Sequence, residues 1–71
     1  MKQKSDFTLV IVGKSGIITR INRKTYTGCL RALLGIRSDC PNIFEDAAEI
    51  LILDNNAMIT VYHEMIEFME V

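Results

Sequence analysis

The stretch from residue 7 to residue 21 reads FTLVIVGKSGIITRI. Two runs rich in β-branched and apolar residues, 7–12 and 17–21, flank a short loop that contains Gly13 and Gly16. This pattern is typical of a β-hairpin, because glycine adopts the positive φ angles that tight hairpin turns need. The first run is apolar at almost every position, so we expect both of its faces to be covered.

The segment after the hairpin has the apolar spacing of a helix. Apolar residues fall at positions 26, 29, 30, 33 and 34, which is one stripe of a 3.6-residue period. Either Asn22 or Thr25 offers an N-cap, and Gly35 suits the position just past a helix end. The sequence therefore predicts a helix from Tyr26 to Leu34.

Two more helices are predicted in the C-terminal half. Asn42 followed by Glu45 fits a capping box, and the apolar residues behind this pair form one helix face. Residues 50–53, Ile-Leu-Ile-Leu, fit a strand equally well, and this alternative stays open. Residues 54–56, Asp-Asn-Asn, offer a cap for a last helix over residues 58–69, where the apolar positions again form a broad stripe.

Together these elements predict an α+β domain in which an N-terminal β-hairpin is followed by three short amphipathic helices (ββααα). We assign residues 1–71 to a single domain, with residues 1–6 as a flexible N-terminal tail. A lone hairpin is marginally stable in water, and so short a chain has a thin stability margin. We therefore expect dimerisation through an exposed strand edge to complete the sheet.

Charge is segregated along the chain. All eight basic residues lie in the first 37 positions, and eight of the nine acids lie from Asp39 onward, although the net charge is only −1. Such asymmetry indicates a charged partner. The alternative is that the two halves fold together and pair their own charges, and both interpretations stay open.

The composition favours an interaction protein. Hydrophobic residues make up 49% of the chain, which is more than so small a core hides easily and favours a homo-oligomer or an apolar docking surface. We predict a small non-catalytic regulator or inhibitor that binds a protein partner and forms a homodimer. The predicted partner-binding acidic surface comprises Glu45, Asp46, Glu49, Glu64 and Glu67.

An alternative function is a nucleic-acid-binding regulator that uses the basic hairpin and first helix, residues 14–37. Its candidate residues supply positive charge for phosphates and one aromatic ring for stacking on a base. They are Lys14, Arg20, Arg23, Lys24, Tyr26, Arg31 and Arg37. Against this alternative, the chain as a whole is slightly acidic, whereas dedicated nucleic-acid binders are usually basic.

No constellation of residues indicates catalysis or metal binding. The Gly13-Lys14-Ser15 run lacks the earlier glycine of a phosphate-binding loop, because Thr8 holds that position. His63 is the only histidine, and His63 with Glu67 would leave a zinc ion under-ligated. We predict that the chain is not an enzyme and binds no metal or cofactor.

The cysteines and the N-terminus bear on the compartment. Cys29 lies on the apolar face of the first predicted helix and Cys40 lies in a loop, so we expect both to be reduced thiols. The polar N-terminus and the short apolar run from Leu9 to Val12 do not fit a signal peptide or a membrane span. We therefore predict a cytoplasmic protein without membrane association.

Overall fold

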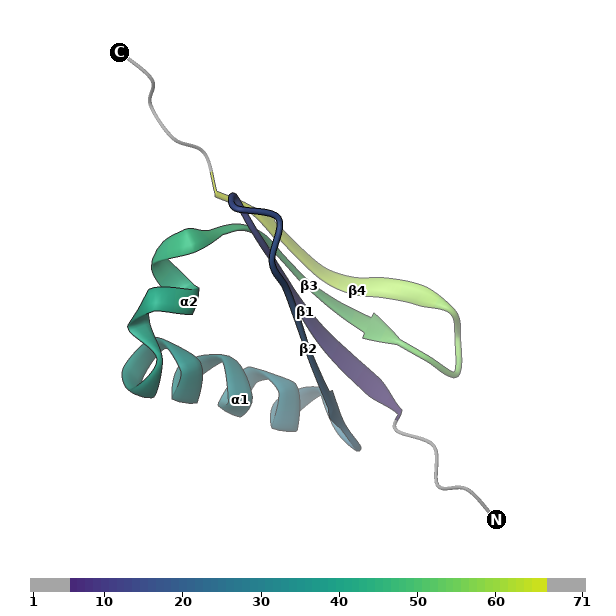
Figure 1. Ribbon diagram of the computed structural model, residues 1–71. Helices are drawn as coiled ribbons and strands as arrows, with labels where there is room; N and C mark the ends of the chain where they lie inside the picture. Colours follow the sequence, from purple (N-terminus) through teal and green to yellow (C-terminus); the bar gives the residue numbers. More distant parts are fainter. Residues whose placement is uncertain (1–5, 67–71) are drawn as a thin grey trace.

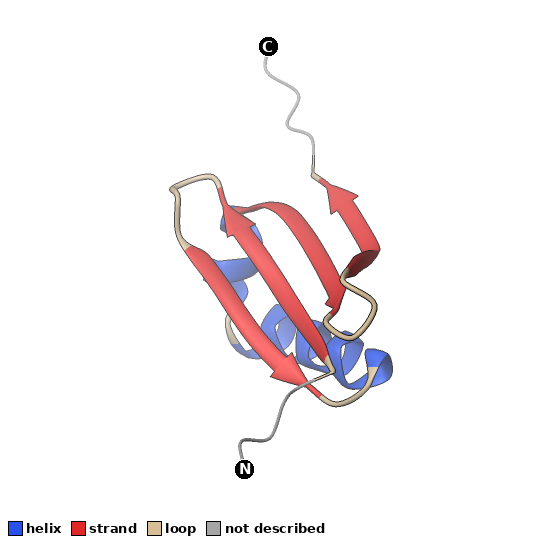
Figure 2. Ribbon diagram, turned by 90° about the vertical axis from the view of Figure 1, so that its right-hand side faces the viewer, coloured by secondary structure: helices blue, strands red, loops and turns tan. Residues whose placement is uncertain are grey.

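The computed structural model describes residues 6–66. The elements in chain order are β1 (Phe7–Gly13), β2 (Ile18–Arg23), α1 (Tyr26–Asp39), α2 (Pro41–Asp46), β3 (Ala47–Asp54) and β4 (Ile59–Met65). The four strands form one antiparallel sheet in the order β2-β1-β3-β4. Both helices lie on the same side of this sheet (Figure 1). Figure 2 shows the sheet from its other side, with the helices behind it.

The predicted N-terminal hairpin is confirmed. β1 pairs antiparallel with β2, and Val10 lies opposite Arg20 near the middle of the pair. Gly16 occupies the connecting turn with a φ of 97°, a left-handed conformation that glycine adopts without steric cost. The short run of glycine and polar residues therefore turns the chain as the sequence indicates.

The helix after the hairpin begins where the sequence predicts. Thr25 is extended, and its Oγ1 accepts a hydrogen bond of 2.9 Å from the backbone N of Gly28, which makes it the N-cap. The helix continues past Leu34, where the sequence predicts its end, runs through Gly35 and stops at Asp39. Pro41 then begins α2, because the missing N–H of proline is not needed in the first turn of a helix.

The prediction of three helices is wrong. The fold is a β-rich α+β domain in which the second predicted helix is only the six-residue α2, and the chain continues directly into β3. Residues 50–53 therefore belong to a strand, which is the alternative that the sequence leaves open. The last predicted helix is β4, paired antiparallel with β3. Positions 67–69 of that predicted helix lie outside the described residues.

Asp54 forms a hairpin turn and does not cap a helix. Its Oδ1 accepts hydrogen bonds of 3.0 and 3.1 Å from the backbone N of Asn56 and of Ala57. Its carbonyl oxygen accepts a bond of 2.7 Å from the backbone N of Met58. The aspartate side chain thus closes the turn in the manner of an Asx turn, and the β-branched residues 59–61 continue as a strand.

The core lies between the sheet and the helices. Its fully buried side chains are Leu9, Ile11, Cys29, Ala47, Ile50 and Ile52. Most of them come from the central strands β1 and β3, so the sheet that encloses the core is built within one chain and needs no second copy to complete it. Neither helix within residues 6–66 is long and apolar enough to cross a membrane.

The edge strand β4 is irregular. Ile52 lies opposite Tyr62, but the next residue of β3, Leu53, lies opposite Thr60. Val61 is therefore an extra residue in β4, which is a β-bulge.

The start of the described chain is attached to the β3–β4 turn. The carbonyl oxygen of Asp6 accepts a hydrogen bond of 2.8 Å from the backbone N of Asn55, and its Oδ1 accepts one of 3.1 Å from Asn56 Nδ2. Asp6, the last residue of the predicted tail, thus forms two hydrogen bonds to this turn. Residues 1–5 lie outside the described part.

Candidate functional site

The side of the sheet that faces away from the helices is the candidate site, and we call it the open face. Successive side chains of a strand point to opposite sides, so the residues that alternate with the core residues belong to this face. It comprises Thr8, Val10 and Val12 of β1, Ile18, Arg20 and Asn22 of β2, Glu49, Leu51 and Leu53 of β3, and Thr60, Val61, His63 and Met65 of β4. No helix of residues 6–66 covers it (Figure 2).

The strand register arranges these side chains in rows across the open face. One row consists of Arg20, Val10, Leu51 and His63, and the next consists of Ile18, Val12, Glu49 and Met65. The outward face of an antiparallel sheet usually carries polar residues when it is solvated. Valine and leucine occupy the central strands instead, so the middle of the open face is apolar.

Apolar side chains of the open face remain accessible to solvent. Ile18 on β2 is 51% exposed and Met65 on β4 is 63% exposed. Between them, Val10 and Val12 of β1 are half-buried by their neighbours. Within one chain, therefore, only the helix side of β1 is fully covered, whereas the sequence predicts cover on both faces.

Charged groups flank the apolar centre on opposite sides. His63 Nε2 on β4 lies 2.6 Å from Glu49 Oε2 on the neighbouring β3. Arg20 lies on β2, at the other side of the sheet, and forms no ion pair with an acid among residues 6–66. An exposed pair such as His63–Glu49 contributes only about 0–1 kcal/mol to stability, so the fold depends little on this contact.

One end of the open face is polar. Asn55 Nδ2 donates a hydrogen bond of 3.0 Å to Thr8 Oγ1, and Thr8 Oγ1 donates one of 2.9 Å to Asn22 Oδ1. These bonds run from the β3–β4 turn across β1 to β2. These hydrogen bonds mark the limit of the apolar area at that end of the open face. The side-chain atoms that form them find their partners within the chain.

The structure distributes the acids of the predicted acidic surface over separate places. Glu45 and Asp46 lie on α2, on the helix side of the sheet. Glu49 lies on the open face, whereas Glu64 points to the opposite side of the sheet because it pairs with a core residue of β3. Glu67 lies outside the described residues. Of the four acids of this set that the structure describes, only Glu49 belongs to the open face.

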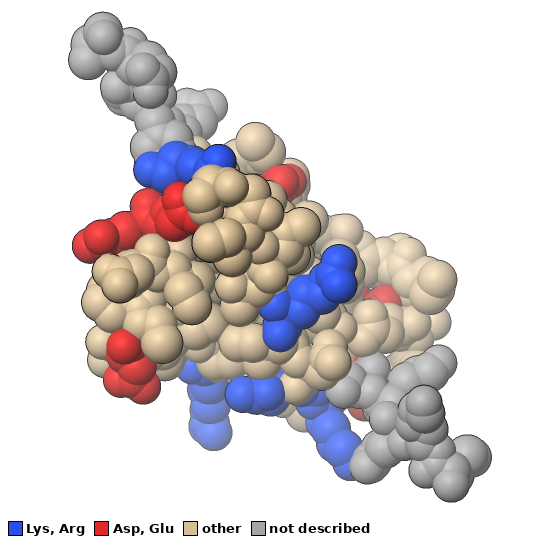
Figure 3. Space-filling model, in the orientation of Figure 1, with Lys and Arg blue, Asp and Glu red and all other residues tan. Residues whose placement is uncertain are grey.

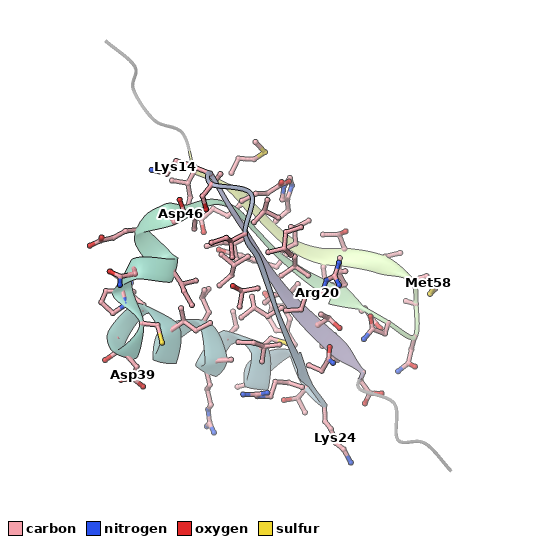
Figure 4. The ribbon with its side chains drawn as sticks, viewed as in Figure 1. Lys14, Arg20, Lys24, Asp39, Asp46 and Met58 are labelled. Carbon is pink, nitrogen blue, oxygen red and sulfur yellow. The ribbon has the colours of Figure 1, made fainter. Side chains whose placement is uncertain are left out.

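The basic residues of the predicted nucleic-acid surface are also spread apart. Lys14 lies in the β1–β2 turn and Lys24 lies just past the far end of β2, so the two mark opposite ends of the molecule (Figure 4). Arg20 lies between them on the open face. Figure 3 shows blue surfaces at separate positions around this view and no single continuous patch.

The remaining candidates of that set lie around α1. Arg23 Nη1 donates to a neighbouring carbonyl oxygen of β2 at 2.8 Å. The ring of Tyr26 is half-buried and packs edge to face against the ring of Phe7, with centroids 6.3 Å apart. Arg31 is exposed on α1, and the guanidinium of Arg37 lies over an aromatic ring of α2. The ring predicted to stack on a base is thus occupied in internal packing.

A pocket of about 230 Å³ opens between the β1–β2 turn and α2. Its wall consists of Ile11, Gly13, Ser15, Ile17, Thr19, Asn42, Ile43 and Asp46. Ser15 Oγ donates a hydrogen bond of 2.7 Å to Asp46 Oδ2. The wall contains no histidine or cysteine, and its one carboxylate is engaged within the chain, so the pocket offers mainly apolar surface.

The histidine and the buried cysteine lie on different sides of the sheet. Both cysteines are free thiols, with Cys29 buried and Cys40 exposed between the helices. Burial raises the pKa of the Cys29 thiol, and the nearby Arg23 guanidinium opposes this increase in part. His63 lies on the open face, so it cannot act as a base for Cys29. Residues 6–66 contain no group of three or more side chains that could hold a metal ion.

Sequence reasoning missed the open face itself. A usable signal was present, because both 7–12 and 50–53 are apolar without the polar alternation of a half-solvated strand. The alternation fails because Val10 and Leu51 lie on the open face and not in the core. Two strands with this pattern in one short chain indicate a sheet with more apolar surface than two small helices can cover.

Comparisons with protein-family models, with curated proteins and with solved structures find no match to this chain. The function is therefore inferred from the geometry of the open face.

Proposed function

We propose that this chain is a small non-catalytic module that binds a protein partner through the open face. The observation that carries the proposal is the apolar centre of that face, formed by side chains of the two central strands, over which no helix of residues 6–66 lies. An exposed apolar area with a polar rim marks a protein-interaction site. Burial of that apolar area favours a complex, and the part that exceeds the cost of lost translational and side-chain freedom appears as affinity.

The charges around the apolar centre support a specific orientation of the partner. Arg20 lies on one outer side, and Glu49 with His63 lies toward the other. Charge pairs at the rim of an interface steer association and set register more than they add affinity. A partner with an acidic group near Arg20 and a basic group near Glu49 is expected to bind in one orientation.

The nucleic-acid alternative gains no comparable observation. Apart from Arg20, its basic residues are divided between the two ends of β2 and the helix α1. Arg20 is the one lysine or arginine on the open face among the described residues. This alternative remains a prediction from charge segregation alone.

A photo-crosslinking amino acid at Ile18 tests the proposal. Ile18 lies on the open face and is 51% exposed, and Leu34 on the outside of α1, 60% exposed, is a matched control position. In cells that express the full chain, we expect protein crosslinks from position 18, weakened by a second change, Met65→Lys, on the same face. Mass spectrometry identifies the crosslinked protein. Equal crosslinking from both positions, or none from position 18, contradicts the proposed function.

A further inference from the structure

We infer that the occupant of the open face is a second copy of this chain, packed face to face about a two-fold axis parallel to the strands. The inference rests on the proposed function and names the partner for the same surface. It follows from the order of charged and apolar side chains across the sheet, β2-β1-β3-β4.

The open face is complementary to itself about this axis. A two-fold axis parallel to the strands reverses their lateral order, so β2 of one copy lies over β4 of the other and β1 lies over β3. This axis keeps each row at its position along the strands, so Arg20 of each copy lies over His63 of the other, and Glu49 lies on the neighbouring strand one row away. Val10 of each copy lies over the strand that carries Leu51, which joins the two apolar centres.

Charge repulsion disfavours the alternative dimer, in which the two-fold axis runs across the strands. A two-fold axis across the strands at the row of Arg20 places β2 over β2 and sets Arg20 of one copy against Arg20 of the other. It places Glu49 over Leu53 of the other copy, where Glu49 meets no opposite charge. Like charges brought together in an interface oppose association, so the charge order selects the axis parallel to the strands.

The spacing of stacked sheets allows these contacts. Two sheets that pack face to face lie about 10 Å apart, with strand directions within about 30° of each other. Arg20 and Glu49 occupy adjacent rows, two residues apart along the strands, which is about 7 Å. A long arginine side chain and a glutamate from opposing sheets both project into the space between the two sheets. Because the dimer has two-fold symmetry, every contact between the copies occurs twice.

Charge reversal and charge exchange test the inference on the full chain. Sedimentation velocity over a concentration series measures the dimer dissociation constant of the wild type and of Arg20→Glu, Glu49→Arg and the double variant. We expect at least a tenfold increase in the constant for each single variant and recovery toward wild type in the double variant. Arg31→Glu makes the same charge change on the outside of α1, where it is expected to leave the constant unchanged. Circular dichroism verifies that each variant is folded.

The outcomes separate this inference from the proposed function. A wild type that stays monomeric at the highest attainable concentration overturns the second copy, while crosslinks from position 18 to a different protein would still support the proposed function. A dimer that Arg20→Glu does not weaken overturns the face-to-face arrangement. Loss of the dimer in Arg20→Glu without recovery in the double variant overturns the axis. Loss of the dimer in Arg20→Glu followed by its recovery in the double variant supports the second copy, the face-to-face arrangement and the axis parallel to the strands.

Discussion

Ser15 in the β1–β2 turn and Asp46 at the end of α2 are joined by a hydrogen bond of 2.7 Å between Oγ and Oδ2. The backbone N of Lys14 donates a second bond of 2.7 Å to the carbonyl oxygen of Asp46. We expect Asp46→Ala to lower the free energy of unfolding by about 1–2 kcal/mol, because it removes one of these attachments. Urea denaturation measures the loss. The neighbouring exposed acid provides the control Glu45→Ala, and an equal loss in both variants would contradict the role of Asp46.

Gly13 lies beside the same carboxylate and has no room for a side chain. A Cβ atom there would collide with Asp46 and lie 3.1 Å from the carbonyl oxygen of Ile17, which is backbone and cannot move freely. We expect Gly13→Ala to reduce stability by about 1–3 kcal/mol. In the control Gly35→Ala, no atom lies within 4 Å of the added Cβ, and alanine in place of glycine inside α1 should raise stability by about 0.5–1 kcal/mol. If Gly13→Ala and Gly35→Ala change the stability in the same direction, this explanation is wrong.

Met58 adopts a left-handed backbone conformation in the β3–β4 turn, with a φ of 61°, and its side chain is 84% exposed. A residue with a Cβ loses about 1–2 kcal/mol in this conformation, whereas glycine does not. Met58→Gly should therefore raise the free energy of unfolding by up to about 1 kcal/mol. Met58→Ala keeps the Cβ and should give no such gain. Thermal unfolding of the two variants measures this difference. A loss of stability in both variants would instead indicate that the methionine side chain stabilises the fold by packing.

The two thiols should react at very different rates. Cys40 is exposed, whereas Cys29 is buried in the core with a raised thiol pKa. A colourimetric disulfide reagent should therefore modify one thiol rapidly in the native protein and the second only when the protein opens. The Cys40→Ser variant should lose the rapid phase. Rapid modification that persists in this variant would show that Cys29 is accessible.

The phenol of Tyr62 should titrate late because of Glu64. Its hydroxyl donates a hydrogen bond of 2.7 Å to Glu64 Oε1, and this bond, followed by burial, raises the pKa of Tyr62. The proton is thus held more tightly in the folded state, so this contribution to stability is present below the unfolded pKa of about 10 and is lost as the pH rises through the folded pKa.

Ultraviolet absorbance measures this effect. In a Tyr26→Phe background, the tyrosinate absorbance reports only Tyr62, and Glu64→Ala should shift its titration to lower pH. A titration that does not move would show that the hydrogen bond does not set the pKa of Tyr62.

The N-terminal half of the fold could be predicted because its signals are local. Gly16 permits the turn, and Thr25 caps the helix that follows it. The C-terminal half could not be predicted in this way, because β3 owes its place to pairing with a distant strand, as in Val10 opposite Leu51. Leu51 and Leu53 lie on the open face, so residues 50–53 lack the polar alternation that would have identified an outward-facing strand.

The acids of the predicted acidic surface are separated in the structure for the same reason. A helical period groups Glu45, Asp46 and Glu49 on one face, but a strand begins between Asp46 and Glu49 and turns the last of them to the other side of the sheet. Charge segregation along the sequence likewise does not predict where charges lie in space. Arg20 and Glu49 come from opposite halves of the chain and lie on the same face, on strands separated only by β1.

The extra residue Val61 in β4 limits how the sheet can grow. A straight edge strand offers an unbroken row of free N–H and C=O groups, which recruits further strands and leads to fibres. The bulge interrupts that row in β4 and increases the local twist. On the other edge, β2 carries Arg20 and ends in Arg23, and positive side chains disfavour the approach of an identical strand. The chain can therefore display an apolar sheet to a partner while both edges resist polymerisation.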